Sequence, residues 1–288
     1  MSYRRTLIHC LDRPGGRFLL GKIATFYVRR ITGDATEIGY RHGFWTHRTG
    51  THFFPDGLTF YTYFDFEAWK NQTDACVSQA KDFYLFEYTP KPGDVIVDIG
   101  AGQGEDTLAF SSSVGPLGRV LAIEAHPLSF AMLRSFCRLN RLTNVTPLEV
   151  ALMDKSGIVH VVESTSSWKE NTVERNGTAS GVTVRARTLD DICAEQGINE
   201  IAFLKMNIEG AERHALPGTA GMLSRVRQIC VACHDFRADR GHGEQFRTRA
   251  FVERFLIERG FTLSSRPNDP RDYVRDHVYG SRTAKPLA

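Results

Sequence analysis

Three glycines at alternating positions separate an apolar segment from the start of a predicted helix. Residues 95–99 form a mostly apolar strand interrupted by one acid, Asp98, and Gly100, Gly102 and Gly104 follow it. Glycine tolerates positive φ and lets a ligand approach the backbone, and the amides at the start of a helix attract a phosphate or a carboxylate. The segment therefore predicts a binding site for a nucleotide-like ligand.

An acid at the end of the next predicted strand narrows the kind of ligand. Glu124 closes the apolar segment 120–123, about 20 residues after the last glycine, where an acid accepts hydrogen bonds from ribose hydroxyls. The glycine spacing is G-x-G-x-G and lacks the G-x-G-x-x-G pattern that suits a pyrophosphate. A nucleoside without a pyrophosphate fits better than a dinucleotide. The alternative is a tight turn with Glu124 as a surface acid.

Further polar side chains follow two later apolar segments. Asn207 and Glu209 come after residues 201–206, and His234 comes after residues 228–232. Open parallel sheets bind ligands beyond the carboxyl ends of their strands, so we expect these side chains to lie near the glycine turn. Imidazole titrates near neutral pH, which makes His234 the predicted general base. The alternative for His234 is hydrogen-bonded packing at a strand end.

Metal binding is a separate hypothesis for the same region. Glu209, His234 and Asp235 could offer oxygen and nitrogen ligands to Mg²⁺. Asn207 carries no charge, however, and hard cations favour carboxylates. We do not favour Mg²⁺ as a cofactor, and the metal assignment stays open. The Cys230-Val-Ala-Cys233 segment is predicted to hold core thiols, because positions i and i+3 of a strand point to opposite faces.

The elements that position these residues alternate between strands and helices from residue 89 onward. Short apolar strands separated by helices of ten or more residues indicate a doubly wound α/β fold with a mostly parallel sheet. The predicted strands are 95–99, 120–123, 145–152, 201–206 and 228–232, and the helices start at Glu105 and span Pro127 to Leu139.

Two parts of this region depart from the alternation. Residues 155–187 predict a strand pair, Ile158–Val162 and Val182–Arg187, around a polar loop from Ser164 to Gly181. Polar loops of this length are more often functional than structural. The chain then predicts a helix over 245–259 and an antiparallel edge hairpin of strands 261–264 and 277–281.

Residues 1–88 predict an N-terminal extension rich in aromatic side chains. The alternation from Leu58 to Phe66 predicts a half-buried strand, and Asp56-Gly57 predicts a turn in a small antiparallel unit. A helix is expected from about Asp74 to Glu87, before Pro90. The predicted organisation is an extension at 1–88 and a ligand-binding domain at 89–288.

The first 32 residues hold seven basic side chains against one acid, Asp12. Six apolar residues recur there at roughly helical spacing, which predicts a basic amphipathic helix. Such a helix could dock on a membrane surface or a partner, or it could cover the catalytic domain or form a homodimer seam; we favour the second pair of interpretations. The six apolar residues are Phe18, Leu19, Ile23, Phe26, Tyr27 and Ile31.

Composition excludes several classes of protein. The net charge is only +3 and turns negative beyond residue 32, so we expect no nucleic-acid partner. No apolar run is long enough for a transmembrane segment. Six scattered cysteines without a secretory leader favour a cytoplasmic protein with free thiols.

Four segments together resemble the FkbM-type S-adenosylmethionine-dependent methyltransferases, over about residues 56 to 282. The resemblance implies the class I methyltransferase fold, with a seven-stranded sheet whose last strand is antiparallel. It also implies methyl transfer to a hydroxyl of a sugar or natural product, or to a carboxylate. The segments are Asp98-Ile-Gly-Ala-Gly-Gln-Gly-Glu105, Ala122-Ile-Glu-Ala-His126, Thr188-Leu-Asp-Asp191 and Leu204-Lys-Met-Asn-Ile-Glu-Gly-Ala-Glu212.

The resemblance also implies roles for particular residues. The glycine turn would hold the methionine part of S-adenosylmethionine, Glu124 its ribose, and Val150 with Ala151 its adenine. Asn207 stands where many relatives have Asp, which removes a carboxylate. The implied catalytic residues are Asn207, Glu209 and His234, and the cofactor contacts are Asp98, Gly100, Ala101, Gly102, Gly104, Thr107, Glu124, Ala125, Val150, Ala151 and Asn207.

The function expected from the sequence is an O-methyltransferase with a small-molecule acceptor and S-adenosylhomocysteine as product. A catalytically silent nucleoside-binding module on the same fold is the first alternative. A dinucleotide-dependent oxidoreductase is the second, and the glycine spacing disfavours it.

Overall fold

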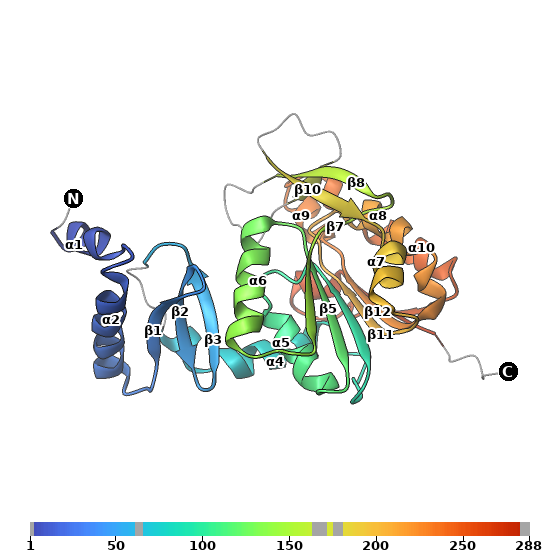
Figure 1. The fold of residues 1–288 in the computed structure, drawn as a ribbon. Coiled ribbons are helices and arrows are strands. Elements are labelled where there is room, and N and C mark those ends of the chain that lie inside the picture. The colour runs from blue at the N-terminus through green and yellow to red at the C-terminus, as the bar shows by residue number, and fades with distance from the viewer. Residues whose placement is uncertain (1–2, 61–65, 163–171, 175–180, 283–288) are drawn as a thin grey trace.

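A computed structural model describes residues 3–60, 66–162, 172–174 and 181–282. Three layers follow one another across the molecule in Figure 1: an N-terminal helix pair, a small antiparallel sheet, and a larger sheet with helices on both faces. Among the described residues, no helix is long and apolar enough to cross a membrane.

A mostly parallel sheet of seven strands forms the centre of the larger part, as the sequence predicts. Its order is β13-β14-β12-β11-β4-β5-β6, with β14 antiparallel to both of its neighbours. Successive strands run outward in both directions from β4, so the carboxyl ends of β4 and β11 flank the crevice where such sheets bind ligands. The strands are β4 Val95–Ile99, β5 Arg119–Glu124, β6 Val145–Glu149, β11 Ile201–Met206, β12 Val226–Ala232, β13 Thr262–Ser264 and β14 His277–Ser281.

The buried residues of each strand alternate between two apolar clusters, one on each face. Val97 and Leu204 pack with helices α7 and α10, whereas Ile96 and Phe203 pack with α4 and α5. Both faces of the sheet are therefore covered by apolar side chains, which explains why the strand sequences are continuous apolar runs. The helices are α4 Gln72–Phe83, α5 Glu105–Val114, α6 Pro127–Leu139, α7 Leu189–Gln196 and α10 Arg249–Ile257, with short helices α8 Glu212–Ala215, α9 Asp235–Asp239 and α11 Asp272–Arg275 and 3-10 turns at 216–219, 222–225 and 244–246.

The predicted third strand is not one strand. The chain leaves the large sheet after β6, and β7 Ala151–Leu152 pairs in parallel with β10 Gly181–Arg187 of a second sheet. Because β6 is the outermost strand, no further neighbour holds this segment in line. The antiparallel pair of β8 Gly157–Val162 and β10 is confirmed, and part of the predicted polar loop is strand β9 Thr172–Glu174. The rest of that loop lies outside the described residues.

The N-terminal part contains helices α1 Tyr3–Leu11 and α2 Arg17–Thr32, a three-stranded meander, and the short helix α3 Phe66–Lys70. The predicted turn at Asp56-Gly57 is wrong: these residues end β3, and the turns stand at 42–43 and 50–51, where His42, Gly43 and Gly50 have positive φ. The strands are β1 Glu37–Arg41, β2 Phe44–Thr49 and β3 His52–Gly57.

The strand predicted over 58–66 is also wrong where the structure describes it. Residues 58–60 form no strand, residues 61–65 lie outside the described part of the chain, and Phe66 begins α3. The backbone N–H of Phe60 donates a hydrogen bond to Asp12, whose other carboxylate oxygen accepts one from the indole of Trp45. These contacts turn the chain back toward α1, away from a strand partner.

The small sheet is joined to the larger part through β3 and α6. The Asn140 side chain accepts a hydrogen bond from the N–H of Phe53 and donates one to its carbonyl, both at 2.8 Å. Phe54 packs against Phe136 with their ring centroids 5.5 Å apart. The division at residue 88 remains a prediction.

Candidate active site

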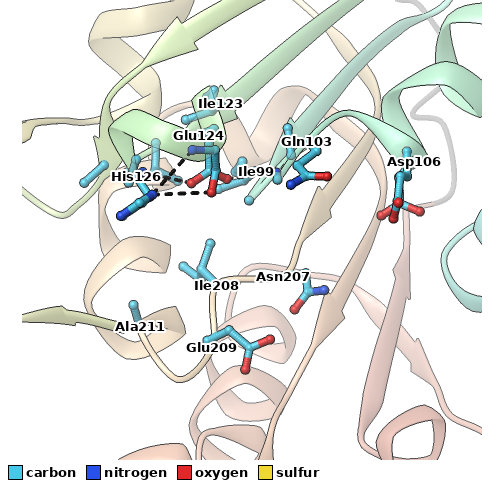
Figure 2. Close-up of a pocket in the computed structure, with 18 of the residues that line it drawn as sticks. Ile99, Gln103, Asp106, Ile123, Glu124, His126, Asn207, Ile208, Glu209 and Ala211 are labelled. Atoms are coloured by element: carbon cyan, nitrogen blue, oxygen red, sulfur yellow. Dashed lines mark hydrogen bonds between the residues drawn. The ribbon is translucent and has the colours of Figure 1, made fainter. Parts of the chain in front are cut away.

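A cavity of about 320 Å³ opens at the carboxyl ends of β4, β5 and β11. Figure 2 shows Glu124 and His126 on one side of it and Asn207 and Glu209 on the other. Most of the predicted cofactor contacts line the cavity: Gly100, Ala101, Gly102, Glu124, Ala125, Val150, Ala151 and Asn207. Glu209 lines it as well. Asp98, Gly104, Thr107 and His234 are not among its lining residues.

The glycine turn brings β4 against the loop that follows β11. Gly100 has φ +76°, and a Cβ atom there would lie 1.9 Å from the carbonyl oxygen of Asn207. Any side chain would push the two loops apart, so glycine is required at this contact. Gly102, at φ +56°, has open space where its Cβ would be, and its N–H points to Glu124.

Lys205 holds this turn in place from inside the sheet. Its side chain is 1% exposed, and its ammonium lies 2.9 Å from Asp98 and donates a 2.7 Å hydrogen bond to the carbonyl of Gly100. Burial alone would lower the pKa of Lys205, but the carboxylates of Asp98 and Asp106 outweigh it and raise the pKa. Lys205 therefore stays charged and keeps the end of β4 beside β11.

The predicted role of Asp98 as a direct cofactor contact does not fit this arrangement. Asp98 is fully buried, pairs with Lys205, and accepts a 2.7 Å hydrogen bond from the hydroxyl of Thr107. Thr107 is likewise fully buried. Both residues support the glycine turn from the side away from the cavity. The sequence pattern alone cannot distinguish a residue that supports this turn from one that contacts the cofactor.

Glu124 lies at the rim of the cavity with fixed geometry. One carboxylate oxygen accepts a hydrogen bond from the N–H of Gly102 and the other from the N–H of His126, each at 2.8 Å. Burial raises the pKa of Glu124, and these two hydrogen bonds counteract part of that rise. Each carboxylate oxygen keeps a lone pair that could accept a ligand hydroxyl.

On the opposite side, Asn207 presents an unsatisfied acceptor. Its amide nitrogen donates to the Tyr84 hydroxyl at 3.0 Å, while its Oδ1 is buried and accepts no hydrogen bond from any described residue. A buried acceptor without a partner is costly. It is suited to a ligand that brings an N–H or an O–H group.

Glu209 is held as a carboxylate beside this acceptor. It has φ +52°, accepts a 2.7 Å hydrogen bond from Arg237, and lies 3.2 Å from His234. Burial would raise the pKa of Glu209, but the charges of His234 and Arg237 outweigh burial and lower it.

The surroundings of His234 favour its protonated form, which argues against the predicted role as general base at neutral pH. Its ring lies between Glu209, at 3.2 Å, and Glu212, at 3.4 Å. Burial opposes the protonated form, but the two carboxylates raise the pKa of His234 to about 10. An imidazole that already carries its second proton cannot accept another. The buried imidazolium instead fixes the position and charge of Glu209.

Asp235 does not complete a metal site. Its carboxylate accepts hydrogen bonds from the N–H groups of Thr248, at 2.8 Å, and Arg249, at 3.0 Å, at the start of α10. No group of three or more His, Cys, Asp or Glu side chains within the described part of the chain is arranged to hold a metal ion.

The sequence interpretation missed several lining residues. Tyr84 follows α4, lines the cavity and contacts Asn207, which is 123 residues away along the chain, so no local pattern reveals this contact. Asp106 also lines the cavity, and burial raises its pKa to about 6 in spite of Lys205 nearby. The other lining residues not predicted are Cys76, Gln79, Ile99, Gln103, Glu105, Ile123, His126, Ser129, Leu152, Val161, Ile208 and Ala211.

A second cavity of about 200 Å³ adjoins the first, and both are lined by Gln103 and Glu105. Its wall includes His47, which stacks on Trp69 with ring centroids 4.1 Å apart and lies 2.7 Å from Asp56. The aromatic residues of the N-terminal sheet thus stand next to the cavity of the large sheet.

Comparison with known proteins places this chain among methyltransferases. A family model described as "Methyltransferase FkbM domain" matches residues 98–263, more than half of the chain. The 2-O-methyltransferase NoeI of Sinorhizobium fredii (strain NBRC 101917 / NGR234) is 26% identical over 161 residues, covering 50% of this chain and 65% of that protein. The 31-O-demethyl-FK506 methyltransferase FkbM of Streptomyces tacrolimicus is 27% identical over 176 residues, covering 50% and 67%. The chain spans about two thirds of the length of these relatives.

Among solved structures, the methyltransferase FkbM from Methylobacillus flagellatus is similar at a TM-score of 0.43 and 16% identity, covering 74% of this chain and 60% of that one.

The charge state of His234 makes the first testable prediction. Its pKa is about 10 in the folded protein and near 6.5 in the unfolded chain, so its ion pairs stabilise the fold fully below about pH 6.5 and lose that effect as the pH rises through 10. We expect His234→Gln to lower the free energy of unfolding by about 3 kcal/mol at pH 6.5, and by much less above pH 10. Urea denaturation across this range measures the difference. His242→Gln, at an exposed loop position, is the control. No loss of stability at pH 6.5, or an equal loss at pH 6.5 and pH 10.5, would contradict a pKa of about 10 for His234.

Proposed function

The chain belongs to the FkbM methyltransferase family, and on that basis we propose that it transfers a methyl group from S-adenosylmethionine to an oxygen atom of a small molecule. The observation that carries the proposal is the cavity itself, which Glu124 lines on one side and Asn207, with its unsatisfied Oδ1, lines on the other. The Glu124 carboxylate can accept hydrogen bonds from hydroxyl groups, and Asn207 Oδ1 can accept one from an N–H or an O–H group. A nucleoside joined to an amino acid carries both kinds of donor.

The lining residues fit S-adenosylmethionine in the order expected from the sequence. Glu124 would hold the ribose hydroxyls, Val150 and Ala151 would contact the adenine, and the turn at Gly100 to Gly102 would follow the methionine part. Asn207 Oδ1 would accept a hydrogen bond from the ammonium group. When bound, S-adenosylmethionine supplies a methyl group already activated by its positively charged sulfur.

Glu209 is our proposed proton acceptor in place of His234. It lines the cavity next to Asn207, and the neighbouring cations keep it ionised at neutral pH. A hydroxyl acceptor must lose its proton as the methyl group is transferred, and a carboxylate within hydrogen-bond reach can take it. His234 and Arg237 then act as positioning residues. If the acceptor is a carboxylate, the reaction requires no base.

The acceptor class remains a hydroxylated sugar or natural product. Support comes from the names of the two relatives, both of which specify transfer to oxygen. Support also comes from the adjoining cavity, whose lining combines the aromatic residues Trp69 and Phe54 with the polar Gln103. Such a wall suits a ring-shaped acceptor with both apolar and hydroxyl surfaces.

We further place the protein in a reducing compartment, the cytoplasm. All six cysteines are free, and only Cys10 is exposed. Cys230 and Cys233 belong to the apolar clusters on opposite faces of the sheet, which supports their role as core thiols. We expect no nucleic acid among its substrates, because the surplus of positive charge is confined to the N-terminal segment.

Removal of the Glu124 carboxylate should weaken cofactor binding. Glu124→Ala deletes two charged acceptors of the ribose, worth about 1.5–3 kcal/mol, or roughly ten- to a hundredfold in Kd. Titration calorimetry with S-adenosylhomocysteine measures the change. Glu149→Ala is the matched control, because Glu149 lies opposite Glu124 on β6 but is exposed and outside the cavity. An unchanged Kd for Glu124→Ala would rule out the ribose assignment.

Replacement of Glu209 should separate chemistry from binding. We expect Glu209→Gln to lower kcat by about a hundredfold or more while the Kd for S-adenosylhomocysteine changes little. The measurement is release of S-adenosylhomocysteine with a library of hydroxylated glycans and natural products, with Glu244→Gln in the exposed 3-10 turn at 244–246 as control.

The pH profile identifies the base independently. Because the pKa of Glu209 is lowered from the ordinary value of 4.5 for a glutamate, the midpoint of the acidic limb of the kcat profile should lie below pH 4.5. A limb near 6.5 would assign the proton transfer to a neutral histidine and overturn the role of Glu209. Tight binding of S-adenosylmethionine without turnover on any acceptor would favour the catalytically silent module.

A further inference from the structure

Helix α2 packs on the outer face of the N-terminal sheet through one narrow stripe of buried side chains. Leu20, Ala24 and Val28 are buried against the sheet. The hydroxyl of Thr25 donates to the carbonyl of Ile38 at 3.0 Å and accepts from its N–H at 2.9 Å. These contacts fix the rotation of the helix about its axis, so the direction of its other side chains follows.

The opposite face of α2 exposes large apolar side chains. Phe18 is 76% exposed and Phe26 is 73% exposed, and Leu19, Ile23 and Ile31 are each more than half exposed. Single exposed apolar residues need no explanation, but a continuous helical row of them marks an interaction surface. The six apolar residues that predict this helix, Tyr27 included, are thus all exposed, and different residues form the buried stripe. They do not cover the large sheet, and their role in a homodimer seam remains a prediction.

Positive charge surrounds this apolar row. α2 contains Arg17, Lys22, Arg29 and Arg30 and no acidic residue. The ammonium of Lys22 lies 5.4 Å from the ring centre of Phe18. A groove beside the helix, of about 810 Å³, is lined by three of these cations and by Arg41 from β1, with Glu37 as its only acid; Glu37 pairs with Arg41.

The position of α2 leaves this face accessible. Figure 1 shows α2 at the outer end of the molecule, on the side of the small sheet that faces away from the large sheet. A broad surface could approach it without covering the cavity at β4 and β11. Exposed Leu7 on α1, which packs beside α2, extends the apolar area.

We propose that α2 lies in the interface of an anionic lipid bilayer. Phe18, Leu19, Ile23 and Phe26 would enter the boundary between headgroups and acyl chains, and Lys22 and Arg30 would pair with lipid phosphates. A 16-residue helix whose exposed face carries both apolar side chains and cations, with no acid, has the composition of such interfacial helices. The inference does not depend on the proposed reaction.

Other occupants fit these observations less well. A second copy of the chain would bring two basic helices face to face, and α2 offers no carboxylate to compensate. A nucleic acid would match the charge but not Leu19 and Ile23, which cannot stack on bases as aromatic rings do. An anionic apolar boundary satisfies both the cations and the aliphatic side chains.

Vesicle flotation with the full chain tests the proposal. We expect the protein to float with vesicles of phosphatidylcholine and phosphatidylglycerol and to remain unbound with phosphatidylcholine alone. The variant Phe18→Ser/Phe26→Ser and the variant Lys22→Glu/Arg30→Glu should each lower the partition coefficient by about tenfold or more. Because these side chains are on the exposed face, both variants should keep the unfolding midpoint of the parent protein.

Matched controls separate this surface from general effects. Leu117→Ser removes a side chain that is 87% exposed elsewhere, and Lys155→Glu/Arg225→Glu makes the same change in net charge at two exposed positions outside α2. Neither should alter partitioning. Binding that is equal for neutral and anionic vesicles, or unaffected by the α2 variants, would overturn the proposal. So would a dimer in sedimentation that Phe18→Ser/Phe26→Ser converts to a monomer, because α2 would then be a seam between copies.

Discussion

One buried ion pair sets the geometry of the whole site. Lys205 on β11 and Asp98 on β4 face each other inside the sheet at 2.9 Å, and the same ammonium binds the carbonyl of Gly100. Neither charge can be left alone in the interior without a cost of about 3–5 kcal/mol. The pair therefore keeps the two strands in register where their ends diverge. The glycine turn, the loop with Asn207 and the cavity between them all depend on that contact.

Neighbouring charges also set the ionisation state of Glu209, on the side of the cavity where we propose that proton transfer occurs. The proposed reaction requires the partly buried Glu209 to be ionised, and its ion pairs with His234 and Arg237 keep it ionised. Glu212 in turn balances His234 from the other side. His234, at a strand end, is the residue that the sequence predicts as the base, whereas in our proposal it is the cation that keeps Glu209 ionised. Function and stability thus rest on one small group of charges.

Much of the frame was predictable because each strand reads as an apolar run bounded by turn residues. Residues 95–99, 127–139 and 201–206 were bounded correctly for this reason, and Glu124 followed from its spacing after the glycines. Three properties were not predictable, because they depend on contacts across the fold. These are the protonation of His234, the reach of Tyr84 into the cavity, and the side of α2 that packs, since a helical period shows that a helix has two faces and not which one is buried.

A crystal structure with S-adenosylhomocysteine is the most direct test of the central claim, that this cavity holds the methyl donor. We expect both ribose hydroxyls within about 3.2 Å of the Glu124 carboxylate, and the sulfur directed toward Asn207 and Glu209 with the Lys205–Asp98 pair intact. The account would be contradicted if the compound bound elsewhere, or if its ribose lay away from Glu124 with the sulfur pointing into the sheet.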